Sequence, residues 1–166
     1  MAGGFKQFGP TYNSTQYLRL GYEGTIDGLH DVDVAAAQAV NGELCGKIAA
    51  MGANGVTLAG AAGAGAIGLF REDLNDMINA SGKASFYIRG GEYFVAESRL
   101  GVAIGAFAPS MKLTTNAGGQ LIPVAAPTDK VVATVIYIGV WTNGNMYQWA
   151  GAAANGGLFL GFILHI

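Results

Sequence analysis

Three glycines carry the spacing in this chain that most suggests chemistry. Gly63, Gly65 and Gly68 lie in the run Gly60–Phe70 and match the pattern G-x-G-x-x-G. In dinucleotide-binding enzymes such glycines form a tight turn from a strand into a helix, and the helix N-terminus binds the pyrophosphate. Alternatively, small residues in this run allow neighbouring strands of a β-rich protein to approach closely. The two interpretations lead to different functions, an enzyme or a structural protein.

The enzyme interpretation needs elements around the glycines that the sequence does not favour. It requires a helix over 69–78, and Glu92 as the acid that binds the ribose. Glu92 follows Gly63 by 29 positions (92 − 63), whereas the usual spacing is about 20. The strand expected at Ala84–Arg89 also runs directly into a two-glycine turn, while parallel strands need crossovers of about a dozen residues or more. We therefore expect no cofactor and no catalytic residues.

Acidic and histidine side chains form the other candidate sites. Glu72, Asp73 and Asp76 could bind a cation, but their spacing favours the first turn of a helix that is exposed to water. Only two histidines are present, His30 and His165, so a histidine-based zinc site is not expected. The sequence thus predicts no metal site.

Composition excludes several classes of protein. Charged residues make up 12% of the 166 residues and the net charge is -2, whereas an ordinary globular domain is about 25% charged. A nucleic-acid-binding protein would show a basic face. The single cysteine, Cys45, cannot form an intramolecular disulfide and is expected to be buried. We expect no signal peptide, because the first residues lack an apolar core, and no transmembrane helix, because the charge-free run 48–70 is mostly Gly and Ala.

The first 16 residues differ from the rest of the chain. They are rich in Gly, Asn and Ser, show no periodicity, and contain the aromatic residues Phe5, Phe8 and Tyr12, with Tyr17 directly after them. We expect an extended N-terminal arm over 1–16 that docks either on a neighbouring subunit or on its own core. The remainder, 17–166, is expected to form a single β-rich domain.

Short apolar runs separated by glycine-containing turns indicate a mainly β fold. Gly90-Gly91 between two aromatic-rich runs predicts a hairpin, and four Asn-Gly steps favour further turns. Short helices are expected over 31–40 and 72–79. The fold class predicted is a small β-barrel or sandwich with one or two short helices. The expected strands are 44–50, 56–60, 67–70, 84–89, 92–98, 102–107, 113–115, 121–124, 131–140, 146–149 and 158–166.

The C-terminal segment 131–166 contains no charged residue. Its alternating pattern fits central strands of the core, and its aromatic residues fit a subunit interface, where charges are depleted; both can hold for opposite faces of one strand. The candidate interface residues, with the aromatic residues of the arm, are Phe5, Phe8, Tyr12, Tyr17, Trp141, Tyr147, Trp149, Phe159 and Phe162.

Residues 56–138 resemble phage head decoration proteins, also called capsid cement proteins, of the small β-barrel type. The resemblance lies in an Ala/Gly-rich strand, a short acidic turn, a Gly-Lys-Ala step before a hairpin, and a Lys-Leu-Thr turn with glycines. The segments that carry it are 56–60, 66–70 with 72–74, 82–96, 112–121 and 131–137.

The resemblance implies a non-catalytic virion protein. Such proteins bind the outer surface of an assembled capsid, usually as homotrimers, and stabilise it by bridging capsomers. It implies a major capsid protein as partner, no nucleic acid or membrane contact, synthesis in the host cytoplasm and location on the capsid surface. Another phage structural subunit, such as a tail-tube or minor capsid protein, is the alternative, and a nucleotide-binding enzyme that uses Gly63–Gly68 is the third hypothesis.

Overall fold

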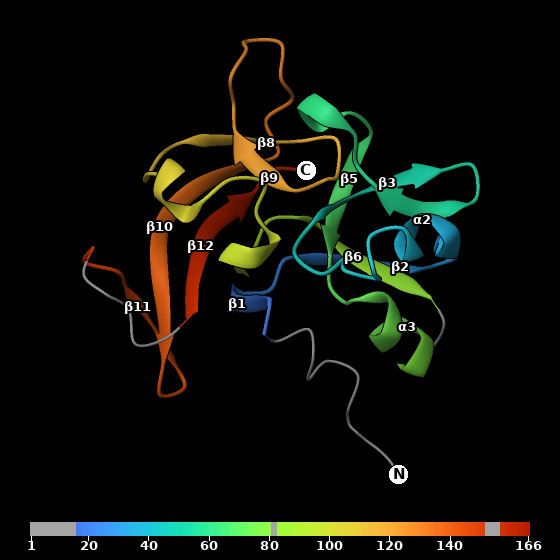
Figure 1. Cartoon of the computed structure of the whole chain (residues 1–166), viewed down its shortest axis with the longest axis horizontal. Helices are drawn as coiled ribbons and strands as arrows, with labels where there is room; N and C mark the ends of the chain where they lie inside the picture. Colours follow the sequence, from blue (N-terminus) through green and yellow to red (C-terminus); the bar gives the residue numbers. More distant parts are fainter. Residues whose placement is uncertain (1–15, 81–82, 152–156) are drawn as a thin grey trace.

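The computed structural model describes residues 16–80, 83–151 and 157–166. It confirms the mainly β fold: two antiparallel sheets pack as a sandwich and do not close into a barrel (Figure 1). The predicted arm over 1–16 lies outside the described residues except for its last residue, Gln16.

The larger sheet has seven strands in the order β1-β7-β12-β10-β8-β9, with β11 paired to the far end of β10. β10 and β12 are the long strands of this sheet, and both come from the charge-free C-terminal segment. The bounds are β1 Leu18–Tyr22, β7 Glu92–Ala96, β8 Lys112–Thr115, β9 Leu121–Pro123, β10 Ala133–Thr142, β11 Asn145–Gln148 and β12 Gly157–Leu164.

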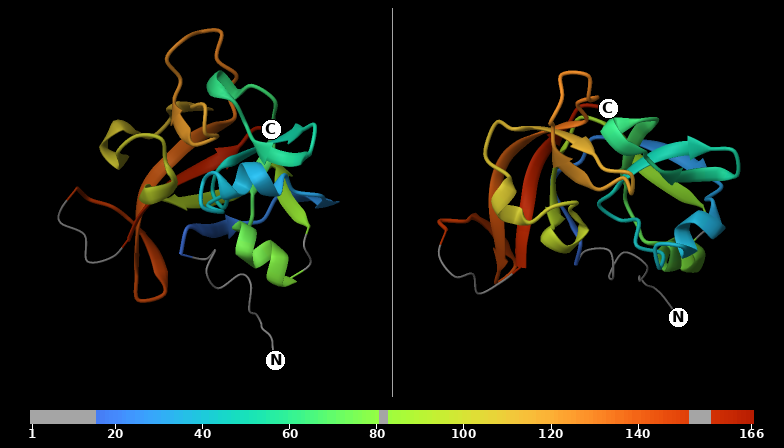
Figure 2. Two further views of the ribbon diagram at one scale, coloured as in Figure 1. Left: turned by 45° about the vertical axis from the view of Figure 1, so that its right-hand side comes forward. Right: turned by 45° about the horizontal axis from the view of Figure 1, so that its top comes forward.

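The smaller sheet has five strands in the order β2-β6-β5-β3-β4. Two short helices, α2 and α3, lie beside it (Figures 1 and 2). Asp33 caps α2, because its side chain accepts a hydrogen bond from the Ala36 N–H at 3.0 Å. The bounds are β2 Thr25–His30, β3 Ile48–Gly52, β4 Gly55–Leu58, β5 Ala66–Phe70, β6 Ala84–Arg89, α2 Val34–Gln38 and α3 Leu74–Ala80, with 3₁₀ turns η1 Ala61–Gly63, η2 Glu97–Arg99 and η3 Ile104–Ala106.

Three apolar clusters define the layers. The largest lies between the sheets and joins Leu69 and Tyr87 from the smaller sheet to Tyr93 and Phe162 from the larger one. A second cluster lies between the smaller sheet and the helices α2 and α3. The third lies on the other side of the larger sheet. Helices therefore cover the outer face of the smaller sheet, while no helix of the described chain covers that of the larger sheet.

Gly90-Gly91 does not make the expected hairpin. β6 pairs with β2 and β5, whereas β7 pairs with β1 and β12, so the two glycines carry the chain from one sheet to the other. The connection between β1 and β2 crosses at the same corner, and Gly24 lies against it: a Cβ there would be 2.3 Å from the Arg89 carbonyl oxygen. The two glycines have φ of 67° and 87°, which provides the bend.

Other sequence predictions differ from the structure in detail. The strand expected at 102–107 is wrong, because this segment contains the 3₁₀ turn η3. β1 and β2 were not predicted. The Asn143-Gly144 step does form a hairpin turn between β10 and β11, with φ of 50° and 79°. Asn155-Gly156 lies outside the described residues.

The acidic cluster before α3 was expected to be a helix turn exposed to water, and this expectation is wrong. The Asp73 carboxylate forms a bidentate ion pair with Arg99, at 2.7 and 3.0 Å, and accepts the N–H groups of Leu44 and Cys45 at 3.0 and 2.9 Å. Asp76 is buried as well. Burial alone lowers the pKa of Arg99, but its bonds and attraction to Asp73 raise it above its usual value. This ion pair fastens the start of α3 to the turn that follows β7.

Candidate interaction face

The three glycines of the fingerprint have structural roles. The helix required at 69–78 is absent: Gly68 lies inside strand β5, and α3 begins only at Leu74. A Cβ at Gly68 would be 2.6 Å from the Tyr87 carbonyl oxygen, and one at Gly63 would be 2.8 Å from the Lys130 Cβ. Gly63 and Gly68 therefore make room for neighbouring chain, while Gly65 has a positive φ of 72°.

Two groups of polar side chains have the residue types of acid–base chemistry. His30 Nε2 lies 3.2 Å from Asp27 Oδ2. Elsewhere, Thr134 Oγ1 lies 2.6 Å from His165 Nε2 and accepts a hydrogen bond from Lys112 Nζ at 3.2 Å. Solvent reaches both groups. Among the described residues, no three His, Cys, Asp or Glu side chains are placed to hold a metal ion.

The larger sheet carries an apolar cluster on the face turned away from the sandwich core, which we call the outer aromatic face. Phe94, Ala96 and Phe159 form its buried centre. The residues around them are only partly buried. The outer aromatic face comprises Tyr17, Phe94, Ala96, Ile136, Tyr137, Trp141, Met146 and Phe159.

Strand pairing places these side chains together. Phe94 pairs with Gly161 on β12, and Gly161 pairs with Tyr137 on β10. Gly161 leaves room for the Phe94 ring, since a Cβ there would be 2.6 Å from Phe94 Cε1. The Phe94 and Tyr137 rings meet edge to face with centroids 5.4 Å apart, an arrangement that aromatic pairs prefer. Burial and the nearby carboxylate of Glu92 raise the pKa of Tyr137.

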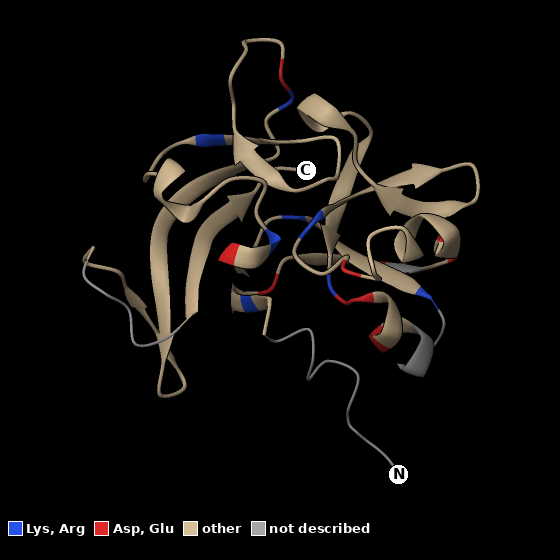
Figure 3. Cartoon of the chain, viewed as in Figure 1, with Lys and Arg blue, Asp and Glu red and all other residues tan. Residues whose placement is uncertain are grey.

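One cation lies on this face. The Arg19 side chain from β1 extends over it, and its guanidinium carbon is 3.6 Å from the Trp141 ring centroid and 6.0 Å from that of Phe159. Such a stack is a cation–π interaction. Burial lowers the pKa of Arg19 below its usual value. β10, β11 and β12 themselves carry no charged residue among those described (Figure 3).

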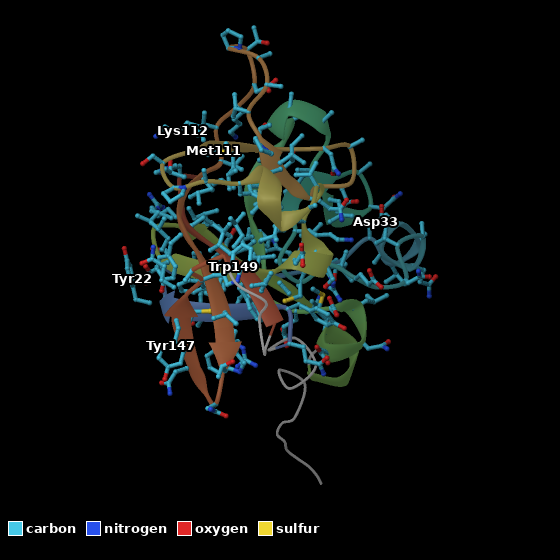
Figure 4. The ribbon with its side chains drawn as sticks, turned by 60° about the vertical axis from the view of Figure 1, so that its left-hand side comes forward. Tyr22, Asp33, Met111, Lys112, Tyr147 and Trp149 are labelled. Atoms are coloured by element: carbon cyan, nitrogen blue, oxygen red, sulfur yellow. The ribbon has the colours of Figure 1, made fainter. Side chains whose placement is uncertain are left out.

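The structure separates the candidate interface residues. Tyr17, Trp141 and Phe159 belong to the outer aromatic face, whereas Phe162 is fully buried between the sheets. Tyr147 is 53% exposed and projects from the surface on β11 (Figure 4).

The remaining candidates fall elsewhere. Trp149 follows β11 and is half-buried. Its backbone N–H donates to the Ile138 carbonyl at 2.8 Å. Phe5, Phe8 and Tyr12 lie outside the described residues. Among the described residues, therefore, three of the candidates come together on one face.

Sequence reasoning missed Phe94, Tyr137 and Arg19. Alternation offered a signal for the first, since Phe94 and Tyr93 must face opposite sides of β7. No signal identified Arg19, because its contact with Trp141 depends on three successive strand pairings.

The chain matches no protein-family model, no curated protein and no solved structure. No helix among the described residues is long and apolar enough to cross a membrane.

Proposed function

We propose that this chain is a non-catalytic structural subunit that binds other protein subunits through the outer aromatic face. The observation that carries the proposal is the asymmetry of the sandwich: helices cover the outer face of the smaller sheet, whereas the larger sheet presents partly exposed aromatic residues on strands without charges. Aromatic enrichment with charge depletion is typical of the core of a protein interface.

Within this class we propose a virion protein that decorates a phage capsid and stabilises it by bridging capsomers, as a homotrimer bound to the major capsid protein. The resemblance of residues 56–138 to decoration proteins supports this choice. A capsid surface offers many identical sites, so an interface of modest area per subunit gains from multivalency. A tail-tube or minor capsid subunit would use the same face for a different assembly.

Two exposed positions allow a matched test of the face. Ile163 is 36% exposed and lies on the outer side of β12, because its neighbours Phe162 and Leu164 face the core. Val102 is 39% exposed and lies in a loop away from this face. Ile163→Glu introduces a charge on the outer side of β12, beside the outer aromatic face and opposite Glu92 on β7, and Val102→Glu introduces the same charge elsewhere.

The assay is the molar mass of purified protein by light scattering, followed by electron microscopy of phage particles labelled with an antibody to the chain. We expect a trimer, label on the capsid surface, and loss of both with Ile163→Glu but not with Val102→Glu. A stable monomer that is absent from particles would overturn the proposal. Rings or tubes of the purified protein would instead support the tail-tube alternative.

A further inference from the structure

Among the described residues, two arginines stack closely on aromatic rings, and only one of them has a carboxylate partner; a third, Arg71, lies farther from its ring, at 5.4 Å from the Tyr87 centroid. The guanidinium carbon of Arg99 is 3.7 Å from the Tyr17 ring centroid, and its two terminal nitrogens bind Asp73. The guanidinium carbon of Arg19 is 3.6 Å from the Trp141 centroid. The two arginine–aromatic stacks have similar distances. They differ in the partner of the guanidinium, because Arg99 binds the Asp73 carboxylate and Arg19 binds no carboxylate of the described chain.

Arg19 has no acidic partner among the described residues. The ion pairs of the described chain are His30–Asp27, Lys83–Asp31 and Arg99–Asp73. The Nε of Arg19 is shielded from solvent and has no hydrogen-bond partner in that part of the chain. A shielded donor without an acceptor is unfavourable.

Glu92, the acid on the same side of β7 as Phe94, does not serve as the partner of Arg19. Glu92 lies two residues from Phe94, which pairs with Arg19, and its carboxylate lies against Gly21 at the end of β1. Glu92 forms no ion pair with Arg19. The outer aromatic face therefore combines apolar rings with one guanidinium that has no carboxylate partner among the described residues.

We infer that the outer aromatic face binds an acidic side chain, Asp or Glu, that lies within an apolar segment of a partner protein, and that Arg19 anchors this carboxylate. The inference rests on the proposed function, since it names the chemistry of the partner at the same face. A guanidinium offers a planar fork that matches a carboxylate in two parallel hydrogen bonds. Trp141 holds that fork in one plane, and the rings beside it provide the apolar contact.

The Arg99–Asp73 pair shows the arrangement that the partner would complete. There the stacked guanidinium donates to both carboxylate oxygens and also to the Cys45 carbonyl, at 3.1 Å. Arg19 carries the same set of donors, and none of them binds a carboxylate of the described chain. A lysine at this position would keep the charge but lose both the fork and the stack.

Short blocked peptides test the carboxylate without knowledge of the natural partner. The probes are acetyl-Leu-Asp-Phe-amide and acetyl-Leu-Asn-Phe-amide, which differ only in the charge of one side chain. The readouts are the NMR signals of the Arg19 Nε–H and the Trp141 indole N–H in the full chain. We expect the acidic peptide to bind about tenfold more tightly than its amide, which corresponds to about 1.4 kcal/mol.

Variants assign this preference to Arg19. Arg19→Lys should lower the preference for the acidic peptide several-fold, and Arg19→Met should abolish it. Arg89→Met is the matched control, because Arg89 is exposed at the end of β6, and it should leave the preference unchanged. Equal binding of the two peptides to the unaltered chain, or no shift of the Arg19 Nε–H with either, would overturn the inference.

A third peptide, acetyl-Leu-Asn-Phe with a free carboxyl terminus, distinguishes the source of the carboxylate. If it alone binds, the partner group is a chain end and the inference as stated is wrong. If the acidic peptide binds but the protein neither assembles nor labels particles, the Arg19 site stands and the proposed function fails.

Discussion

Removal of the Asp73 carboxylate should destabilise the fold more than any change to an exposed acid. Asp73→Ala leaves Arg99, whose side chain is only 4% exposed, as a buried charge without its counter-ion. It also removes an acceptor of the Leu44 and Cys45 N–H groups, although the Leu44 N–H keeps the Gly42 carbonyl at 3.1 Å. The pair joins α3 to the turn after β7, so its loss weakens the contact between the two sheets.

The expected loss follows from these contacts. Breaking a buried ion pair by removing one partner costs about 3–5 kcal/mol, and the loss of Asp73 as an acceptor of the Cys45 N–H costs about 1–3 kcal/mol. The sum is an upper bound, because the Asp73 side chain is 16% exposed and water can replace part of what is lost. We expect a decrease of about 4 kcal/mol in the free energy of unfolding, that is, a Tm lower by about 8–16 °C for a chain of this size.

Thermal unfolding followed by circular dichroism measures this difference. Asp31→Ala is the control, since it breaks the solvent-exposed pair with Lys83 and should leave Tm unchanged. Adding Arg99→Met to Asp73→Ala should recover part of the lost Tm, because it removes the unpaired charge. If the double variant unfolds at the same temperature as Asp73→Ala, or Asp73→Ala lowers Tm no more than the control, the reasoning fails.

Two further predictions concern the packing of β5 and the alkaline limit of the fold. Gly68→Ala should lower Tm by several degrees, because its Cβ would meet the Tyr87 carbonyl oxygen, whereas Gly105→Ala should not, since a Cβ there has no neighbour within 4 Å; equal effects of the two changes would contradict the packing role. Burial raises the pKa of Tyr87 to about 12, while an unfolded tyrosine titrates near about 10. The folded state therefore keeps a proton that the unfolded state loses, so stability that is present below about pH 10 falls as the pH rises towards 12. Tm should be lower at pH 11 than at pH 9, and Tyr87→Phe should reduce this decrease; an unchanged decrease would show that Tyr87 does not cause it.

Local patterns were enough to predict some elements. The charge-free apolar runs at the C-terminus became β10 and β12, and the acids at 31–33 preceded a helix that Asp33 caps. In both cases the signal lies within a few residues of the element itself. Single-residue bounds were less accurate: the strand expected at 44–50 begins at Ile48.

Pairing between distant segments was not predictable in the same way. The residues around Gly90-Gly91 have the composition of a hairpin, but β1 and β2 pair with β7 and β6 respectively and draw the two flanks into different sheets. The apolar residues of β1 alternate, at Leu18, Leu20 and Tyr22, but Leu20 and Tyr22 are exposed, so this alternation does not mark a buried face. The acidic cluster was misjudged for a related reason, because the partner of Asp73 lies 26 residues further along the chain.

At the candidate site, too, composition predicted the kind of residue, whereas strand pairing decides which residues come together. Strands without charged residues were predictable, since the depletion of charge over 131–166 is visible in the sequence, and the interface stays a prediction. Successive side chains of a strand point to opposite faces of the sheet, so the fold decides which aromatic residues face outward. On β12, Phe159 lies on the outer face and Phe162 in the core. Arg19 lies 122 positions before Trp141 (141 − 19), so only the folded sheet brings them together.

The position of Arg19 also decides between two accounts of the outer aromatic face. If the face were simply a thin satellite core beneath solvent, a carboxylate on a neighbouring strand would be the ordinary way to satisfy its guanidinium, as Asp73 does for Arg99. Among the described residues, the strands β10, β11 and β12 supply no acid, and the carboxylate of Glu92 lies over Gly21 instead. Arg71 also has a shielded Nε without an acceptor in the described chain, but its guanidinium donates to Ser85. The Arg19 guanidinium, 3.6 Å from the Trp141 centroid and without a carboxylate in the described chain, is better explained by an acceptor that another molecule brings. That explanation requires a protein partner with an acid at its contact surface, and it is the reason that the peptide pair, which differs by one charge, separates the two accounts.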